Sequence, residues 1–346
     1  MGDLMSHQKL PLSIVVPCYN EEDSLGELVR RVRETCAGME ISFELILVDD
    51  GSSDRTWECI EAQAAEYNEI VGVKLSRNHG HQIALTAGLV QARGQRILMM
   101  DADLQDPPEL LEEMMQTLDD GADVAYGKRN ARRGESIFKK VTAYYFYKII
   151  NRLTDGQIPR DTGDFRLVSR RALDTFLQMN ERFRFVRGMF SWIGYDQRPV
   201  LYDRDPRYAG ETKYTLSKMI RFAVDAITSF SISPLRFSVH VSLFALFVAM
   251  ATTAYVLGAF FFAQPAPGWA SILLVLSFFS AVQLLCIGII GEYVGRLFME
   301  LKGRPLFIVE EVNSGGVVSD EKMAMDGPTK DKARHFDTEI VKSAFS

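Results

Sequence analysis

RILMMDADLQD, residues 96–106, is the stretch of this 346-residue chain that decides the fold, because an apolar run leads straight into clustered acids. The run 96–100 predicts a buried strand. Asp101 and Asp103 follow on a turn where both carboxylates can face one ligand, and their repulsion makes this costly unless a cation is bound. Carboxylate oxygens suit Mg²⁺ or Mn²⁺, which commonly bridge to substrate phosphates. Taken alone, so short a motif is equally compatible with a solvated acidic loop.

Two other predicted strands end in a similar way. Residues 12–16 lead into Pro17-Cys18-Tyr19-Asn20-Glu21, and residues 43–48 lead into Asp49-Asp50-Gly51-Ser52. The carboxyl ends of parallel strands share one edge of a sheet, where open α/β sheets bind their ligands. Such an edge can hold a ribose through a carboxylate and a diphosphate through a metal ion. The three stretches together therefore favour a nucleotide site over an acidic surface.

Short apolar runs alternate with helical patterns along the first part of the chain. Strands are predicted at 12–16, 43–48, 71–75, 96–100 and 124–126, and helices at 24–35, 55–66 and 82–91. This alternation predicts an α/β domain with a mostly parallel sheet and helices on both faces. A dinucleotide-dependent dehydrogenase is excluded, because no GxGxxG follows any of these strands.

Charged residues vanish from 237 to 291, a run of about 55 residues that suffices for two membrane spans of about 20 each. We expect transmembrane helices at 237–262 and 270–295, joined by an external turn at 263–269. Lys and Arg flank the pair on both outer sides and are absent from the turn. The positive-inside rule therefore places the first domain and both termini in the cytoplasm.

Shorter segments complete the expected organisation of the chain. Residues 1–11 form a polar extension without the apolar core of a secretory signal. The apolar side of a helix at 216–230, within the segment 214–236, predicts an interfacial amphipathic helix. The other expected segments are an aromatic helix at 138–153 near the membrane, a cytoplasmic juxtamembrane segment at 296–312 and a disordered tail at 313–346.

Composition narrows the function further. The formal net charge is −6 and no stripe of Lys or Arg dominates, which argues against a nucleic-acid binder. The four cysteines have no metal-ligand spacing, so we expect unpaired thiols in a reducing compartment. Gly291 and Gly295 form a GxxxG pattern, a weak signal that allows a homodimer or homotetramer.

The order and strand context of four motifs resemble family 2 glycosyltransferases of the GT-A fold. The motifs are PxYNE from Pro17, DDGS from Asp49, RNxG from Arg77 and DADLQDPPE from Asp101. Over residues 12–310 the chain is similar to polyprenyl-phosphate glycosyltransferases, a group that includes dolichol-phosphate mannose synthases. It most resembles the bacterial bactoprenol glucosyltransferase type.

This resemblance implies a cytoplasmic GT-A catalytic domain at 12–213 and a role for each matching residue. Asp103 would be central to catalysis, and Asp164, in the segment GDFRL, would be the proposed catalytic base, with Asp161 as the near alternative. The other implied roles are nucleoside binding by Pro17, Tyr19, Glu21 and Asp50, diphosphate contacts by Asp101 and Asp103, metal binding by Asp101, Asp103 and Gln105, sugar or diphosphate binding by Arg129, and lipid-phosphate binding by Arg207 and Lys213.

The activity implied is inverting transfer of a hexose, glucose from UDP-glucose by closest resemblance, to undecaprenyl phosphate at the bacterial plasma membrane. The acceptor phosphate has a second pKa near 6, so it is largely deprotonated already. Asp164 therefore either accepts a proton or orients the reactants. A related rival is a processive polysaccharide synthase, whose QxxRW motif does not occur here. A non-catalytic membrane scaffold is the third reading, and it does not need Asp101 and Asp103.

Overall fold

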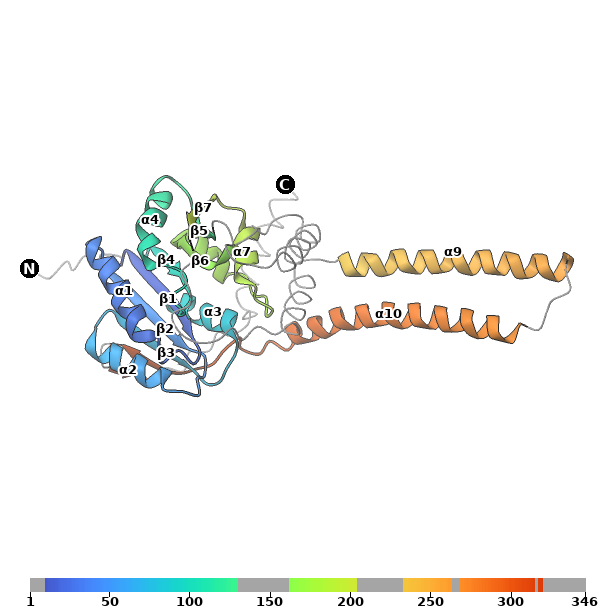
Figure 1. Cartoon of the computed structure of the whole chain (residues 1–346). Helices are drawn as coiled ribbons and strands as arrows, with labels where there is room; N and C mark the ends of the chain where they lie inside the picture. Colours follow the sequence, from blue (N-terminus) through green and yellow to red (C-terminus); the bar gives the residue numbers. More distant parts are fainter. Residues whose placement is uncertain (1–9, 130–161, 204–232, 263–267, 315–316, 320–346) are drawn as a thin grey trace, which may run out of the picture. The chain divides into compact units, whose positions relative to one another are not determined.

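The computed structural model describes residues 10–129, 162–203, 233–262, 268–314 and 317–319 (Figure 1). These residues fall into two units, one formed by most of the chain up to Tyr214 together with the residues from Gly303 onward, the other mainly by 215–302. The predicted helices at 138–153 and 216–230 lie outside the described residues. Of the predicted interfacial segment 214–236, the structure describes only residues 233–236.

The first unit is built on one nine-stranded sheet in the order β7-β5-β6-β4-β1-β2-β3-β8-β9. Its strands are β1 (Leu12–Cys18), β2 (Phe43–Asp49), β3 (Ile70–Leu75), β4 (Arg96–Met99), β5 (Val124–Arg129), β6 (Thr162–Ser169), β7 (Gln197–Tyr202), β8 (Val309–Ser314) and β9 (Val317–Ser319). Its helices are α1 (Leu25–Gly38), α2 (Thr56–Glu66), α3 (His81–Gln91), η1 (Pro108–Leu110), α4 (Leu111–Asp119), α6 (Arg170–Leu177) and α7 (Val186–Ile193).

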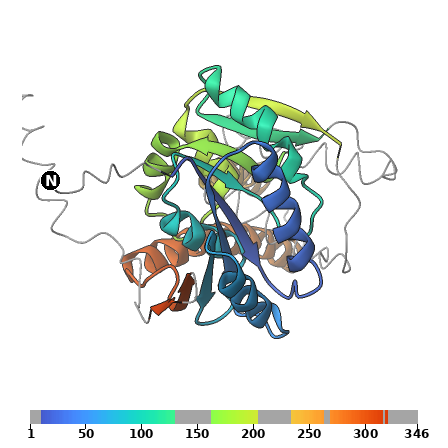
Figure 2. The same cartoon turned by 90° about the vertical axis from the view of Figure 1, so that its left-hand side faces the viewer.

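The centre of the sheet is parallel, as the strand–helix alternation predicts. β3, β2, β1 and β4 run in the same direction, with Leu12 opposite Phe43 on one side and Arg96 on the other. Right-handed connections then place α1 and α2 on one face and α3 on the other (Figure 2). The carboxyl ends of β1, β2 and β4 therefore meet at one edge, where the acidic motifs begin.

β6 brings a distant part of the chain beside this edge. It lies antiparallel between β4 and β5, with Met99 opposite Arg166 and Tyr126 opposite the same residue. On one face of β6, Phe165 and Leu167 are inaccessible to solvent, and on the other face the charged side chains of Asp164 and Arg166 are buried as well. This register places Asp164 just beyond the end of β4.

α3 packs unusually close to the sheet. A Cβ atom added at Gly88 would lie 2.4 Å from Val15 Cγ1 and 2.9 Å from Val48 Cγ2, so only glycine permits this approach. The helix begins at His81, directly after the left-handed Gly80. Close packing therefore fixes the first residues of α3 against the carboxyl edge.

The C-terminal strands correct one prediction. Residues from 313 onward are expected to be disordered, yet β8 pairs antiparallel with β3 as far as Ser314, and β9 pairs with β8. Phe307 and Val309 are buried in the first unit, and the Ser76 N–H donates to the Ile308 carbonyl at 3.0 Å. The edge of β3 offers unpaired backbone groups that this segment satisfies. Residues 320–346 lie outside the described part of the chain.

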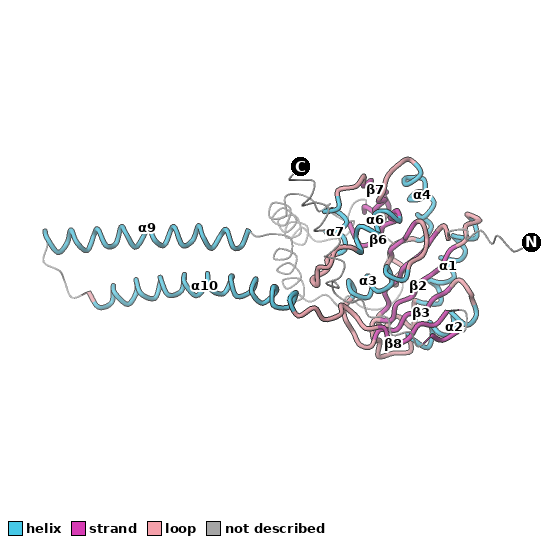
Figure 3. Tube along the Cα trace, turned by 180° about the vertical axis from the view of Figure 1, so that it is seen from behind, coloured by secondary structure: helices cyan, strands magenta, loops and turns pink. Residues whose placement is uncertain are grey.

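The second unit contains two long apolar helices that lie side by side, α9 (Ser233–Phe262) and α10 (Trp269–Leu301) (Figure 3). Each holds a segment long and apolar enough to cross a membrane, Pro234–Tyr255 with mean hydropathy 1.8 and Phe278–Leu301 with mean hydropathy 1.6. The Cys286 thiol lies 3.6 Å from Ser242 Oγ across the pair.

The second helix extends beyond the predicted span at both of its ends. Trp269 is the first residue of α10 rather than part of the turn, and the helix continues past 295 to Leu301. The extension contains no Gly or Pro that would end a helix, and Arg296 pairs with Glu292 one turn earlier at 3.1 Å. The core of the predicted turn, 263–267, lies outside the described residues.

Candidate active site

The acidic turn after β4 is held by its apolar residues. Ala102 and Leu104 are buried, and Leu104 adopts a left-handed φ of 58°. Asp103 is 7% exposed, and its Oδ1 accepts the Gln105 N–H at 3.2 Å. Asp101 remains partly accessible at the start of the turn. The sequence pattern of acids separated by apolar residues thus fixes both carboxylates at the sheet edge.

Asp164 of β6 is a buried carboxylate of the cluster. It is 5% exposed, and its two oxygens face donors from α3 and α7. Gln82 Nε2 donates to Oδ2 at 2.7 Å, and Arg187 Nε donates to Oδ1 at 3.2 Å. Burial alone would raise the pKa of Asp164, but the charges of Arg187, His81 and Arg166 outweigh it and hold this pKa well below its usual range.

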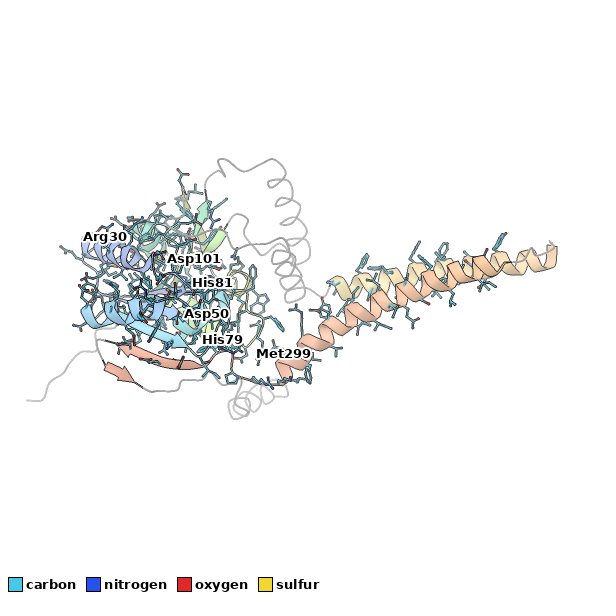
Figure 4. All side chains as sticks on the ribbon, turned by 60° about the horizontal axis from the view of Figure 1, so that its bottom comes forward. Arg30, Asp50, His79, His81, Asp101 and Met299 are labelled. Atoms are coloured by element: carbon cyan, nitrogen blue, oxygen red, sulfur yellow. The ribbon has the colours of Figure 1, made fainter. Side chains whose placement is uncertain are left out.

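His81 joins Asp164 to the acidic turn. Its Nε2 lies 3.4 Å from Asp164 Oδ2 and 3.4 Å from Asp101 Oδ1; His81 and Asp101 are both labelled in Figure 4. Burial opposes the charged imidazole, but the two carboxylates prevail and raise the pKa of His81 to about 9. A histidinium therefore bridges the turn after β4 and the strand β6.

The pKa of Asp101 reflects the crowding of negative charge around it. Burial raises its pKa; His81 opposes that rise, and the nearby carboxylates of Asp106, Asp164 and Asp103 add to it, so that it reaches about 6. A carboxylate disfavoured in this way is stabilised by an added cation. Negative charge is therefore crowded at Asp101, where the sequence predicts a metal.

The residues present fit a divalent cation that is shared with a ligand. Within the described ranges, no three His, Cys, Asp or Glu side chains are grouped as a complete metal site. Mg²⁺ commonly takes only one or two carboxylates from the protein and completes its shell with water and substrate phosphates. Asp101, Asp103 and the adjacent Gln105 supply oxygen atoms of this partial kind.

Two side chains from β5 and β7, Arg129 and Tyr202, are linked by hydrogen bonds to the acidic turn. The Tyr202 hydroxyl donates a short hydrogen bond to Asp106 Oδ1, and Arg129 Nε donates to the Tyr202 oxygen at 3.4 Å. Burial opposes the charge of Arg129, but Tyr202, Asp106 and Asp101 raise its pKa. Tyr202, which belongs to none of the sequence motifs, thus links Arg129 to Asp106 of the acidic turn, and the predicted contact of Arg129 with the sugar or diphosphate stays a prediction.

The loops after β1 and β2 form an interlocked pair beside the turn. The Asn20 N–H donates to Ser52 Oγ at 3.0 Å, and the Glu21 N–H donates to Thr56 Oγ1 at 2.8 Å. Pro17 is buried within β1, whereas the side chain of Tyr19 is 41% exposed. Of the predicted nucleoside residues, Tyr19 therefore offers the most accessible surface.

Asp50 has a structural task that the sequence did not reveal. Its carboxylate oxygens accept the N–H groups of His79 at 2.7 Å and Gly80 at 2.9 Å, and the residue is almost fully buried. Gly51 beside it has φ 65°, and a Cβ there would lie 2.6 Å from the backbone of Arg77. Asp50 and Gly51 together brace the loop that leads into α3.

Other residues of the site had weaker sequence signals. His81 and Gln82 directly follow the RNxG motif, which marks them in retrospect. Arg187 comes from α7, far from any motif, and only the folded sheet brings it to Asp164. Arg207, Lys213 and Asp161 lie outside the described residues.

Comparison with known proteins identifies the class. Residues 13–177 match the family described as glycosyl transferase family 2. An uncharacterized glycosyltransferase of Bacillus subtilis, YkcC, is 43% identical over 302 residues, which are 86% of this chain and 93% of that protein. The chain belongs to glycosyl transferase family 2; it is a glycosyltransferase with the GT-A fold, which confirms the predicted fold class and enzyme class.

Two further similar proteins have names that state a particular activity. The SfII prophage-derived bactoprenol glucosyl transferase of Shigella flexneri is 35% identical over 307 residues, covering 88% of this chain and 99% of that protein. A crystal structure of glucosyl-3-phosphoglycerate synthase from Mycobacterium tuberculosis, in complex with Mn²⁺, UDP and phosphoglyceric acid, has a TM-score of 0.47 and 18% identity, covering 63% of this chain and 76% of that one.

Proposed function

We propose that this glycosyltransferase moves glucose from UDP-glucose to undecaprenyl phosphate at the cytoplasmic face of a bacterial plasma membrane. The observation that carries the proposal is the contact of His81 with Asp101 and Asp164, beside Asp103, in a chain that also has two apolar helices. The bactoprenol glucosyl transferase of Shigella flexneri, similar over nearly its whole length, supports this choice of acceptor and sugar.

The donor occupies the carboxyl edge of the sheet. The exposed ring of Tyr19 offers a face to the nucleoside, with Pro17 and Glu21 beside it. Asp50 acts on the nucleoside through the loop that it braces. Asp101 and Asp103 face the diphosphate, and Arg129 reaches the sugar or the diphosphate. Mg²⁺ or Mn²⁺ held by Asp101, Asp103 and Gln105 would neutralise charge on the leaving diphosphate.

The acceptor explains the two apolar helices. A prenyl chain leaves the bilayer at a cost of about 0.8 kcal/mol per exposed CH₂, so the enzyme has to reach the lipid phosphate at the membrane. α9 and α10 cross the membrane, with the catalytic unit and both termini in the cytoplasm, and the protein assembles as a homo-oligomer. Arg207 and Lys213 bind the lipid phosphate, where a guanidinium fork and an ammonium suit its oxygens.

The reaction is a single displacement. A phosphate oxygen of the acceptor forms a bond to the anomeric carbon from the face opposite the diphosphate. The bond from that carbon to the diphosphate oxygen breaks, and its electron pair leaves with UDP, so the configuration inverts. The acceptor phosphate is mostly deprotonated near neutral pH, and no proton needs to be removed by a strong base.

The rival function is processive synthesis of a polysaccharide. The chain has no QxxRW motif, because none of Trp57, Trp192 and Trp269 is preceded by arginine. The two functions differ in their products: a lipid carrying one sugar, or a polymer.

One assay separates these functions. The purified protein is offered radiolabelled UDP-glucose with undecaprenyl phosphate and Mg²⁺ or Mn²⁺, and the label is followed in the organic and aqueous phases. We expect label in the organic phase only when the lipid phosphate is present, and mild acid should release a single glucose. Label in a polymer would favour the rival, and no transfer from any of a panel of UDP-sugars would refute the proposal.

A further inference from the structure

Asp164 is surrounded by donors that the displacement itself does not explain. The acceptor phosphate needs no strong base, yet this carboxylate is buried and bonded at both oxygens. A general base must be within reach of the proton that it takes and must be free to accept it. The geometry of Asp164 is therefore better suited to holding another group in place.

Gln82 connects three elements through one amide. Its Nε2 donates to Asp164 Oδ2 at 2.7 Å, while its Oε1 accepts the Val186 N–H at 2.8 Å. Val186 is the first residue of α7, so its N–H has no partner within the helix and needs one from outside. The amide thus ties α3 to β6 and α7, and its orientation is set by a donor on one side and an acceptor on the other.

Arg187 secures the other carboxylate oxygen. It is the next residue of α7, and its Nε donates to Asp164 Oδ1 at 3.2 Å. The guanidinium also lies over the ring of Phe185, 5.3 Å from its centroid. With one oxygen held by α3 and one by α7, the plane of the Asp164 carboxylate is fixed, and its Oδ2 faces His81 at 3.4 Å.

We propose that Gln82 and Arg187 are positioning residues that clamp Asp164, so that Asp164 in turn holds His81 against Asp101 at the diphosphate side of the site. The inference rests on the proposed glucosyl transfer and assigns it two further residues. Asp164 then contributes through its fixed position and charge. Loss of the clamp leaves the donor site formed but displaces His81 relative to the reacting bond.

A second Arg–Asp pair in the same unit, between the exposed Arg171 and the buried Asp123, provides the control. Arg171 donates to the buried Asp123 near the other end of β6, and its Nε lies 3.1 Å from Asp123 Oδ1. Breaking this pair removes an ion pair of the same chemistry without touching the site. If Arg187 only stabilises the fold, Arg187→Ala and Arg171→Ala should behave alike.

The test compares Gln82→Glu, Arg187→Ala, Arg187→Lys and Arg171→Ala in the full chain, by kcat and KM for UDP-glucose and by thermal unfolding. Misplacement of a reacting group by about 1 Å lowers turnover about 100-fold, so we expect such a loss of kcat for Gln82→Glu and Arg187→Ala. Their KM should change by less than about threefold, because donor binding is retained. Arg187→Lys should recover part of kcat, and Arg171→Ala should keep wild-type kcat.

The outcomes separate the clamp from the function on which it rests. If the wild type makes lipid-linked glucose but Arg187→Ala and Gln82→Glu keep kcat, the clamp is refuted while the function stands. The clamp is also refuted if the Arg187→Ala and Arg171→Ala proteins lose kcat and thermal stability equally. If the wild type itself transfers no glucose, the proposed function fails and the clamp falls with it.

Discussion

Asp164 poses the main question at the scale of single residues, because a carboxylate at this position of the motif suggests a base. Burial would raise its pKa, but Arg187, His81 and Arg166 hold the pKa well below the usual range. The carboxylate is therefore ionised throughout the pH range in which enzymes are assayed. Its titration does not shape the rate at neutral or alkaline pH.

Replacement of Asp164 by asparagine tests this directly. The substitution removes the negative charge beside His81 and leaves a side chain of the same size, so we expect kcat to fall by about 100-fold at every pH from about 5 to 9. Measurement of kcat against pH in parallel with the wild type gives the answer. A loss that disappears at high pH would show that Asp164 accepts a proton after all.

Tyr202 makes a second prediction at this scale. Tyr202→Phe keeps the ring, whose edge contact with Phe165 has a centroid distance of 5.7 Å, but removes the hydroxyl that links Asp106 to Arg129. A hydrogen bond to a charged group contributes about 1.5–3 kcal/mol, and we expect a loss of kcat/KM of about tenfold or more. Tyr195→Phe, which loses a bond to Thr175, is the control. Equal activity in the two variants would contradict the role of Tyr202.

The residues differ in how far the sequence revealed them. Asp101 and Asp103 were predictable because both follow one strand on one turn, so their proximity is a local property. Arg187 was not, since its contact with Asp164 depends on the pairing of β6 with β4 and on the docking of α7. Asp50 was correctly placed at the sheet edge, yet its bonds to the loop of His79 required the folded structure.

At the scale of elements, the close approach of α3 to the sheet determines where His81 and Gln82 lie relative to the carboxyl ends of the strands. Gly88→Ala would put a Cβ 2.4 Å from Val15 Cγ1, and overpacking of this kind costs about 1–3 kcal/mol. We expect a lower free energy of unfolding together with lower activity, measured by denaturant unfolding and by transfer. Gly26→Ala in α1, where nothing lies within 4 Å of the added atom, should be neutral or stabilising. A stable, fully active Gly88→Ala would contradict this packing.

β8 shows why some elements escape sequence reasoning. The sequence of Val309–Ser314 is VEEVNS, which has few apolar residues and no regular alternation of apolar and polar residues. Its stability comes from the open edge of β3, a partner that is distant in the chain. The strands β1 to β4 were predictable because their apolar runs bury on both faces of a parallel sheet.

Neighbouring residues ahead of β8 test this pairing. Phe307 is 2% exposed and Ile308 is 48% exposed. We expect Phe307→Ala to lower the free energy of unfolding by about 3–5 kcal/mol, because a buried aromatic ring is removed. Ile308→Ala should have a much smaller effect in the same denaturant titration. Similar losses for both would mean that this segment does not pack on the first unit in solution.

At the scale of the whole molecule, the protein combines a catalytic unit built on one sheet with two long apolar helices. α9 and α10 expose large apolar side chains along their length, such as Phe247 and Leu284. This exposure suits lipid and would favour aggregation in water. The absence of charge from 237 to 291 was enough to predict the pair, whereas its boundaries depended on where helical backbone continues without a breaker.

The proposed topology predicts which sites are labelled from outside an intact cell. A cysteine at Ala266, in an otherwise cysteine-free chain, should react with an impermeant thiol reagent before lysis. A cysteine at Glu310 on β8 should react only after lysis, because it lies on the cytoplasmic side. Labelling of both before lysis, or of neither, would contradict a hairpin with cytoplasmic termini.

The most direct measurement of the central claim is the transfer of labelled glucose from UDP-glucose to undecaprenyl phosphate by Asp103→Ala beside the wild type. Asp119→Ala is the control, since this exposed carboxylate pairs with Arg96 away from the cluster. Wild type and Asp119→Ala should label the lipid, while Asp103→Ala and chelated wild type should lose about 100-fold or more. Full transfer by Asp103→Ala, or under exhaustive chelation, would contradict the account.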